Sequence, residues 1–277
     1  MKIISGDSYA LVEPRGAYVR KLVIGGRDIL KETQDGKETH GGACNLIPYA
    51  GRVRNATYTF DGRVYLLPVN SGSNSIHGFA KDRVFKLEEG DSACMLRALS
   101  QISDRGYPSE LRTEITMRIG ERRFEVAYEI TNTGAQRAPV VIGSHPYFLT
   151  GERWRLIHSS EIERLNTDSE GIPDGTLQRV DYNHLRDMSG MTFDECYSGG
   201  GLISLVSDET VIRIQRNGMN FFVLYNGRYC SGSSVAVEPM TGAPDAFNNR
   251  IGLNILEPGQ SMECSFLIEV GDSGEQT

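Results

Sequence analysis

The chain of 277 residues has no long apolar run and no excess of basic residues. No stretch approaches the roughly 18 apolar residues that a membrane-spanning helix needs, and the first residues lack the apolar segment of a signal peptide. Lysine and arginine number 29 against 36 aspartates and glutamates, giving a formal net charge of −7, which opposes binding to phosphate backbones. We therefore expect a cytoplasmic protein with neither nucleic acid nor a membrane as partner.

Cysteines are few, and they form no recognisable pattern. Their number is odd, their spacing is wide, and none belongs to a C-x-x-C pair or has a histidine neighbour at metal-ligand spacing. No cysteine lies in a context typical of an activated thiolate. We predict reduced, mostly buried thiols and no metal site. The five are Cys44, Cys94, Cys196, Cys230 and Cys264.

Helical periodicity is also missing, since no segment sustains a 3.6-residue apolar period over three turns. Glycine is abundant instead, at 31 residues or about 11%, against a usual value of about 7%, which favours turns. Apolar and polar residues alternate in 111–119 and again in 124–130, as in half-buried antiparallel strands. Residues 58–65 contain Asp61-Gly62, the dipeptide of a two-residue hairpin turn. Further β-rich runs lie at 94–102, 139–143, 202–206, 211–215, 221–225, 235–237 and 262–268.

These runs predict an all-β fold, a large antiparallel sandwich or barrel of more than a dozen strands with few short helices. No internal repeat, low-complexity tract or Pro/Ser linker divides the chain. We expect one domain over residues 1–270, followed by a disordered tail over 271–277.

Two of the five histidines lie in contexts that are unusual for plain loops. His145 precedes Pro146, which favours an extended conformation, and Gly143 lies two residues earlier on the same strand face, where it would leave room for a ligand. The alternative is a strand-end histidine with structural hydrogen bonds. His77 follows the Gly/Ser/Asn-rich stretch 71–75, where a loop enters a new element.

Two acidic residues complete the candidate site. Alternation along Ser-Val-Ala-Val-Glu-Pro places Glu238 at the end of an apolar strand, where burial would raise its pKa toward the range of a general base. An ion pair between Glu238 and Arg52 is the structural alternative. Asp194 adds a carboxylate that could equally serve a turn. Aromatic residues suited to stacking on sugar rings are Tyr49, Phe79, Tyr147, Phe148, Tyr197 and Phe247, although core packing is the commoner role.

Imidazoles and carboxylates on a β scaffold suit either glycoside cleavage or proton transfer to and from a sugar ring. Five motifs, in this order, resemble the aldose 1-epimerase (galactose mutarotase) family over about residues 48–249. They are Asn-Ser-Ile-His77-Gly, Gly106-Tyr-Pro108, Ser-His145-Pro-Tyr-Phe, Asp194-x-Cys-Tyr197, and Val-Glu238-Pro followed by Pro244-Asp-Ala-Phe-Asn.

The resemblance implies a β-supersandwich that interconverts the anomers of a free sugar without metal or cofactor. It assigns the general acid to His145 and the general base to Glu238. It assigns substrate contacts to Arg52, His77 and Asp194. The expected partner is a small-molecule sugar, and the expected state is a monomer or homodimer. Acid–base catalysis near neutral pH suits a glutamate with a raised pKa and a histidine near its usual value of about 6.5.

The chain departs from the family pattern at two positions. Gly51 stands where the family usually has asparagine, and Met240 stands where many galactose-type members have glutamine. Both changes would remove a polar group from the pocket, so the chain resembles more the shorter, substrate-diverse branch that includes sulfoquinovose mutarotase. A hexose-phosphate epimerase would need an anion site, and the basic residues available for one are Arg52, Arg54, Lys81 and Arg83. The alternative is that these four residues form a solvated basic surface.

A non-catalytic sugar-binding or sensing module is the rival hypothesis from another class, and a glycosidase is the third. The remaining histidines have no assigned role and are expected to be surface or structural residues. They are His40, His158 and His184.

Overall fold

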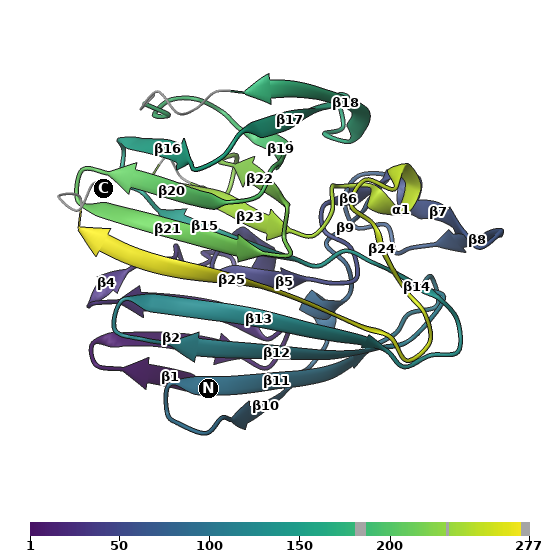
Figure 1. Ribbon diagram of the computed structural model, residues 1–277, viewed down its shortest axis with the longest axis horizontal. Helices are drawn as coiled ribbons and strands as arrows, with labels where there is room; N and C mark the ends of the chain where they lie inside the picture. Colours follow the sequence, from purple (N-terminus) through teal and green to yellow (C-terminus); the bar gives the residue numbers. More distant parts are fainter. Residues whose placement is uncertain (181–186, 231–232, 273–277) are drawn as a thin grey trace.

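Two antiparallel sheets pack face to face in the computed structural model, which describes residues 1–180, 187–230 and 233–272 (Figure 1). The larger sheet has eleven strands. Their order is β1 (Lys2–Ser5), β2 (Ser8–Glu13), β3 (Tyr18–Ile24), β5 (Ala43–Leu46), β15 (Gly143–Leu149), β23 (Ser234–Met240), β22 (Phe221–Tyr225), β19 (Asp194–Ser198), β17 (Ile162–Thr167) and β18 (Pro173–Val180), with β4 (Arg27–Asp28) beside β3.

The smaller sheet has eight strands and covers one face of the larger sheet. Their order is β10 (Lys86–Glu89), β11 (Met95–Ile102), β12 (Leu111–Ile119), β13 (Arg123–Asn132), β25 (Ser261–Asp272), β21 (Thr210–Asn217), β20 (Leu202–Ser207) and β16 (Trp154–His158). The expected all-β antiparallel sandwich is thus confirmed, as are the alternating strands β12 and β13, which pair along their full length.

Short strand pairs and helical turns connect the sheets. The strand pairs are β14 (Ala138–Val140) with β24 (Asn254–Leu256), β6 (Arg52–Val53) with β9 (Ser75–Ile76), and β7 (Thr57–Phe60) with β8 (Arg63–Leu66). The helical turns are η1 (Glu38–His40), η2 (Arg54–Ala56), η3 (Ala80–Asp82) and α1 (Ala246–Asn249). Across the described ranges, no helix has the length and apolar character needed to cross a membrane.

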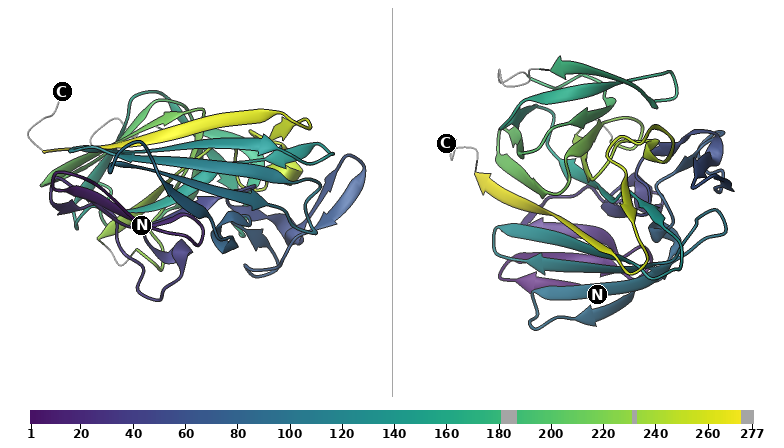
Figure 2. Two further views of the ribbon diagram at one scale, coloured as in Figure 1. Left: turned by 90° about the horizontal axis from the view of Figure 1, so that it is seen from below. Right: turned by 45° about the vertical axis from the view of Figure 1, so that its right-hand side comes forward.

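The hairpin predicted at 58–65 is present as β7 and β8, and it extends away from the sandwich (Figure 2). Asp61 and Gly62 both have positive φ, +48° and +74°, as a two-residue hairpin turn requires. The run 139–143, in contrast, is not one strand. Its Val141 and Ile142 donate their N–H groups to Pro48 and to the Thr241 hydroxyl, so β14 ends before β15 begins.

The end of the chain also differs from expectation by two residues. Gly271 and Asp272 belong to β25 and pair with β21 instead of starting the tail, and residues 273–277 lie outside the described ranges. The core fills the space between the sheets, where Val235 and Val237 of β23 point. All five cysteines are free thiols, and all except Cys94 are buried, as predicted.

Candidate active site

The floor of the site is one row of side chains on the face of the larger sheet that points away from the core. Residues directly opposite each other in an antiparallel pair share a face. Cys44 of β5 is opposite His145 of β15, and Val223 of β22 is opposite both Glu238 of β23 and Cys196 of β19. The β15–β23 register pairs position 143 with 240 and 147 with 236, which places His145 directly opposite Glu238.

A second row lies two residues further along the same strands. Tyr147 of β15 and Tyr225 of β22 are both opposite Ala236, and Tyr225 is opposite Asp194 at the start of β19. The ring of Tyr147 stacks on the imidazole of His145, with centroids 4.6 Å apart and planes at 11°. Strand pairing alone therefore brings together His145, Glu238 and Asp194, which are far apart in the sequence.

Loops form the walls above this floor and enclose a cavity of about 350 Å³. This is near the lower end of the range of about 300–1,000 Å³ for small-molecule sites. The cavity is lined by Thr39, His40, Gly51, Arg52, Asn70, Ser71, Ile76, His77, His145, Tyr147, Gly171, Asp194, Glu195, Cys196, Val223, Tyr225, Tyr229, Glu238 and Pro244. All five residues singled out as catalytic or substrate-binding from the sequence thus lie in one cavity.

The two residues assigned to acid–base roles are in direct contact. His145 Nε2 lies 3.2 Å from Glu238 Oε1, and both side chains are almost completely buried. Burial lowers the pKa of His145 to about 3 and raises the pKa of Glu238 well above its usual value. The expectation for Glu238 is confirmed in direction, but the expectation of an ordinary pKa for His145 is wrong because the imidazole is desolvated.

His77 lies beside this pair in a strained conformation. Its φ is +66°, a region that few residues other than glycine adopt, and its N–H donates to the Gly51 carbonyl. Its ring meets the His145 ring edge to face, with centroids 5.5 Å apart. The Nδ1 atoms of His77 and His145 are both buried without a hydrogen-bond partner in the described structure, which is unusual for buried polar atoms.

Arg52 of the wall and Asp194 of the floor form a charged pair in the cavity. Arg52 Nη2 lies 3.7 Å from Asp194 Oδ2, and no ion pair between Arg52 and Glu238 is present in the described residues. Gly171 approaches the same guanidinium so closely that a Cβ there would lie 2.9 Å from Arg52 Nη1. The Asp194 carboxylate adds to the raised pKa of Glu238, and the Arg52 charge partly opposes it, after the larger effect of burial.

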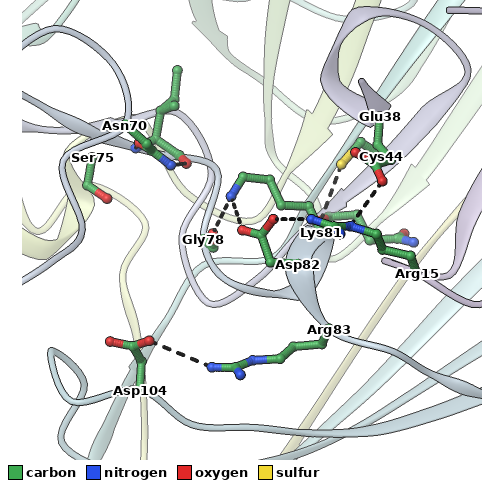
Figure 3. Close-up of polar contacts among 12 residues, drawn as sticks. Arg15, Glu38, Cys44, Asn70, Ser75, Gly78, Lys81, Asp82, Arg83 and Asp104 are labelled. Atoms are coloured by element: carbon green, nitrogen blue, oxygen red, sulfur yellow. Dashed lines mark hydrogen bonds and ion pairs between the residues drawn. The ribbon is translucent and has the colours of Figure 1, made fainter. Parts of the chain in front are cut away.

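The wider basic set does not come together as an anion site. Arg52 lines the cavity, but the other three members do not. Figure 3 shows Lys81 held between the Gly78 carbonyl and the Asp82 carboxylate, with Nζ to oxygen distances of 3.2 and 2.6 Å. The acidic partners of the three are Asp168 and Glu170 for Arg54, Asp82 for Lys81, and Asp104 for Arg83.

Most of the aromatic candidates are core residues. Only Tyr147 lines the cavity, while Phe79 and Phe247 each pack edge to face against Tyr49. Phe148 and Tyr197 are fully buried between the sheets. The aromatic residues missed from the sequence are Tyr225 and Tyr229.

The three unassigned histidines have different outcomes. His40 lines the cavity, and its ring stacks on that of Tyr229. His158 is structural, since its Nε2 lies 3.1 Å from Arg216 and its ring stacks on Phe222. His184 lies outside the described residues.

Cys196 also lines the cavity, but burial raises its pKa, so the protonated thiol is not a nucleophile. Among the described residues, no group of three or more His, Cys, Asp or Glu side chains is arranged to hold a metal ion.

Comparison with known proteins fits this arrangement. The model of the aldose 1-epimerase family matches residues 4–269. The chain belongs to the aldose 1-epimerase family. The uncharacterized protein YihR of Escherichia coli (strain K12) is 24% identical over 295 residues, which cover 97% of this chain and 92% of that protein. Aldose 1-epimerase of the same strain is 30% identical over 156 residues, which cover 53% of this chain and 42% of that protein.

Solved structures support the fold. A galactose mutarotase-like protein from Clostridium acetobutylicum superposes with a TM-score of 0.86 at 16% identity, covering 98% of this chain and 94% of that one. A galactose mutarotase-like protein from Lactobacillus casei gives the same TM-score at 17% identity, covering 98% and 99%. The galactose mutarotase-like supersandwich is therefore the fold of this member of the aldose 1-epimerase family.

Of the two departures from the family pattern, Gly51 and Met240, only Gly51 affects the cavity. Met240 is fully buried and does not line the cavity. The methionine at this position therefore does not change the polarity of the cavity lining. The side chains of Met240 and Ala50 occupy the position that a Cβ on Gly143 would take. The space beside Gly143 is therefore filled by protein atoms and is not open to a ligand. Gly51 does line the cavity, and only there does the departure affect the site.

Proposed function

We propose that this member of the aldose 1-epimerase family is a mutarotase that interconverts the α and β anomers of a free aldose. One observation carries the proposal: a buried imidazole and a buried carboxyl group face each other at 3.2 Å on the floor of a cavity of about 350 Å³. A cavity of that size favours one sugar ring over a longer glycan. Opening a hemiacetal requires one proton donor and one proton acceptor, which this pair supplies.

Beyond the Nδ1 proton of a neutral imidazole, the pair holds one further proton, and ring opening begins with that proton on Nε2 of His145 and with Glu238 ionised. Glu238 accepts the proton of the C1 hydroxyl while His145 donates its Nε2 proton to the ring oxygen. The C1–O5 bond breaks and the aldehyde forms. After rotation about C1–C2, the reverse transfers close the ring on the other face and restore both groups. The opposite pKa shifts of the two groups favour the state in which Glu238 holds the proton, which is the state paired with the open-chain sugar.

The other residues in the cavity hold the sugar. Arg52 and Asp194 offer a donor and an acceptor to ring hydroxyls, and His77, which also lines the cavity, offers a third contact. His145 is held in place by the stacked ring of Tyr147. The anion site of a hexose-phosphate epimerase receives less support, because Arg54, Lys81 and Arg83 are paired with acidic residues.

Polarimetry across a panel of aldoses, with a sugar phosphate and a sulfonated sugar included, tests the proposal. We expect faster anomer equilibration than the spontaneous rate for at least one sugar. We expect Glu238→Gln to lower kcat by about 10²- to 10⁴-fold, the usual contribution of a positioned proton-transfer group. Glu263→Gln is the matched control, because Glu263 is exposed on the other sheet.

Each alternative gives a different outcome. Normal acceleration by Glu238→Gln would contradict the assignment of the base. Saturable sugar binding with no acceleration by the unmodified protein would indicate a binding or sensing module. Release of the phenol from an aryl glycoside would indicate a glycosidase.

A further inference from the structure

An imidazole and a phenol ring stack on each other at the wall of the cavity. His40, the last residue of η1, and Tyr229, in the turn after β22, lie with ring centroids 3.5 Å apart and planes at 13°. Both residues line the cavity that holds His145 and Glu238. Neither belongs to the acid–base pair nor to the residues assigned to substrate from the sequence.

Several contacts fix this pair in place. His40 Nδ1 lies 2.8 Å from Asp35 Oδ2, and Lys31 Nζ donates to the Tyr229 carbonyl at 2.6 Å. The Tyr147 hydroxyl donates to the carbonyl of Thr39 at 2.8 Å. Because Tyr147 also stacks on His145, the segment carrying His40 is linked to the acid–base pair through packed groups.

The Asp35 contact decides which nitrogen of His40 is available. The hydrogen bond from His40 is the largest cause of the low pKa of Asp35, about 2, so the carboxylate is ionised and accepts the Nδ1 proton. Nε2 has no partner among the described residues, and it is not sealed from the cavity as the Nδ1 atoms of His77 and His145 are. In its neutral form Nε2 accepts a hydrogen bond, and in its protonated form it donates one.

We infer that His40, held flat by Tyr229 and oriented by Asp35, is a specificity-determining residue that hydrogen-bonds one sugar hydroxyl remote from C1. A hydroxyl both donates and accepts, so it suits Nε2 in either protonation state. The contact must be remote from C1, because C1 and the ring oxygen lie between His145 and Glu238 in the proposed mutarotase. The inference rests on that function for the orientation of the sugar.

Binding of deoxy sugars tests the inference directly. The dissociation constant is measured by calorimetry or NMR titration for the best sugar of the polarimetry panel and for its 2-, 3-, 4- and 6-deoxy forms. Each is measured on the unmodified protein and on His40→Phe, which keeps the ring stacked on Tyr229 but removes both nitrogens. Asp35→Asn tests the orienting contact, and Asp28→Asn, an exposed carboxylate paired with Lys21, is its matched control.

We expect one deoxy sugar to bind the unmodified protein about tenfold more weakly than its parent, the effect of about one lost hydrogen bond. His40→Phe should weaken binding of the parent sugar by a similar factor. The same variant should bind that deoxy sugar no more weakly than the unmodified protein does, because the contact is already lost. Asp35→Asn should weaken binding of the parent sugar, and Asp28→Asn should not.

Equal affinity of His40→Phe and the unmodified protein for the parent sugar would overturn the inference. The inference would also be overturned if, for every deoxy sugar, the loss of affinity caused by His40→Phe multiplied the loss caused by removing the hydroxyl. A general structural effect of the variant would give that result. Since binding is measured and not turnover, the two proposals fail separately. Coupling here means that the effects of His40→Phe and of removing one hydroxyl on the dissociation constant are not independent. Such coupling without any acceleration of mutarotation would overturn the proposed function alone. Acceleration of mutarotation without such coupling would overturn this inference alone.

Discussion

Burial shifts His145 and Glu238 toward their neutral forms, and this determines how the site should respond to pH. The pKa of His145 falls to about 3, and that of Glu238 rises well above 4.5. Between those limits the pair holds one proton beyond the Nδ1 proton, whichever group carries it. This singly protonated state is the one that the proposed reaction needs.

We therefore expect kcat/KM for mutarotation to be flat through pH 6.5. Activity should fall on the acid side only when the pair takes up a second proton, far below the usual histidine pKa, and on the alkaline side when Glu238 loses its proton. The measurement is polarimetry from pH 5 to 9 with the spontaneous rate subtracted at each pH. A half-loss of kcat/KM near pH 6.5 on the acid side would contradict the shift assigned to His145.

Gly51 gives a second prediction for a single residue. Its φ is +70°, which asparagine tolerates, but a Cβ there would lie 2.7 Å from the Cβ of Pro244. Gly51→Asn, which restores the usual family residue, should therefore lower the free energy of unfolding by about 1–3 kcal/mol through overpacking. Gly25→Asn is the control, because Gly25 also has positive φ and nothing lies within 4 Å. Equal losses of stability in urea titrations of both variants would contradict the role of Pro244.

The sequence predicts residues at the site unevenly. Glu238 is found by strand alternation, because its neighbours Val235 and Val237 mark the core face. His40 is not found, because its position follows from a loop that returns to Tyr229, some 190 residues later, and no local pattern encodes that contact. Gly143 is misread as ligand space, because its open side depends on what packs opposite, which is Met240 and Ala50.

At the scale of elements, the register of β15, β23, β22 and β19 assembles the floor of the site. The sequence predicts that these strands exist, but their order is not consecutive in the chain, so it does not predict which residues face each other. The split of run 139–143 has a similar cause. Val141 bonds to Pro48, a partner from a distant loop, so the local β pattern continues where the sheet does not.

The connection between β17 and β18 and the first residues of β18 offer a test at this scale. Gly171 and Gly175 both have positive φ, +71° and +91°, so alanine strains either position by about 1 kcal/mol. A Cβ at Gly171 would also lie 2.9 Å from Arg52 Nη1, whereas nothing lies within 4 Å of one at Gly175. We expect Gly171→Ala to lower kcat/KM by displacing Arg52, and Gly175→Ala to leave it unchanged. Equal kcat/KM values for the two variants would contradict the coupling between Gly171 and Arg52.

At the scale of the whole molecule, burying Glu238 costs stability as the pH rises. The unfolded chain releases this proton near pH 4.5, and the folded chain retains it to higher pH. The contribution of the group to stability is therefore complete below about pH 4.5 and is lost as the pH rises through the folded pKa.

Glu238→Gln removes this dependence. The Tm of the variant minus the Tm of the unmodified protein should thus become more positive between pH 5 and pH 8 in thermal unfolding. Glu263→Gln, at an exposed position, should show no such trend. A difference for Glu238→Gln that stays constant with pH would show that the carboxyl group is not desolvated.

The sandwich as a whole follows from short alternating runs and the lack of helical periodicity, and it is confirmed. The division into two sheets is less accessible, because apolar residues on strands of both sheets face one shared core. Only long-range pairing, such as β13 with β25, decides which strand joins which sheet.

The floor and the walls of the cavity come from different kinds of structure. His145 and Glu238 are spaced by the hydrogen-bond ladder between β15 and β23, which sets neighbouring strands about 4.8 Å apart regardless of the loops. His40, Arg52 and Gly171 belong to connecting segments or short edge elements that can change in length and sequence without disturbing that ladder. The same chemistry can then be inherited unchanged while the choice of sugar diverges, so grafting the wall segments of one relative onto the floor of another should transfer preference without loss of turnover.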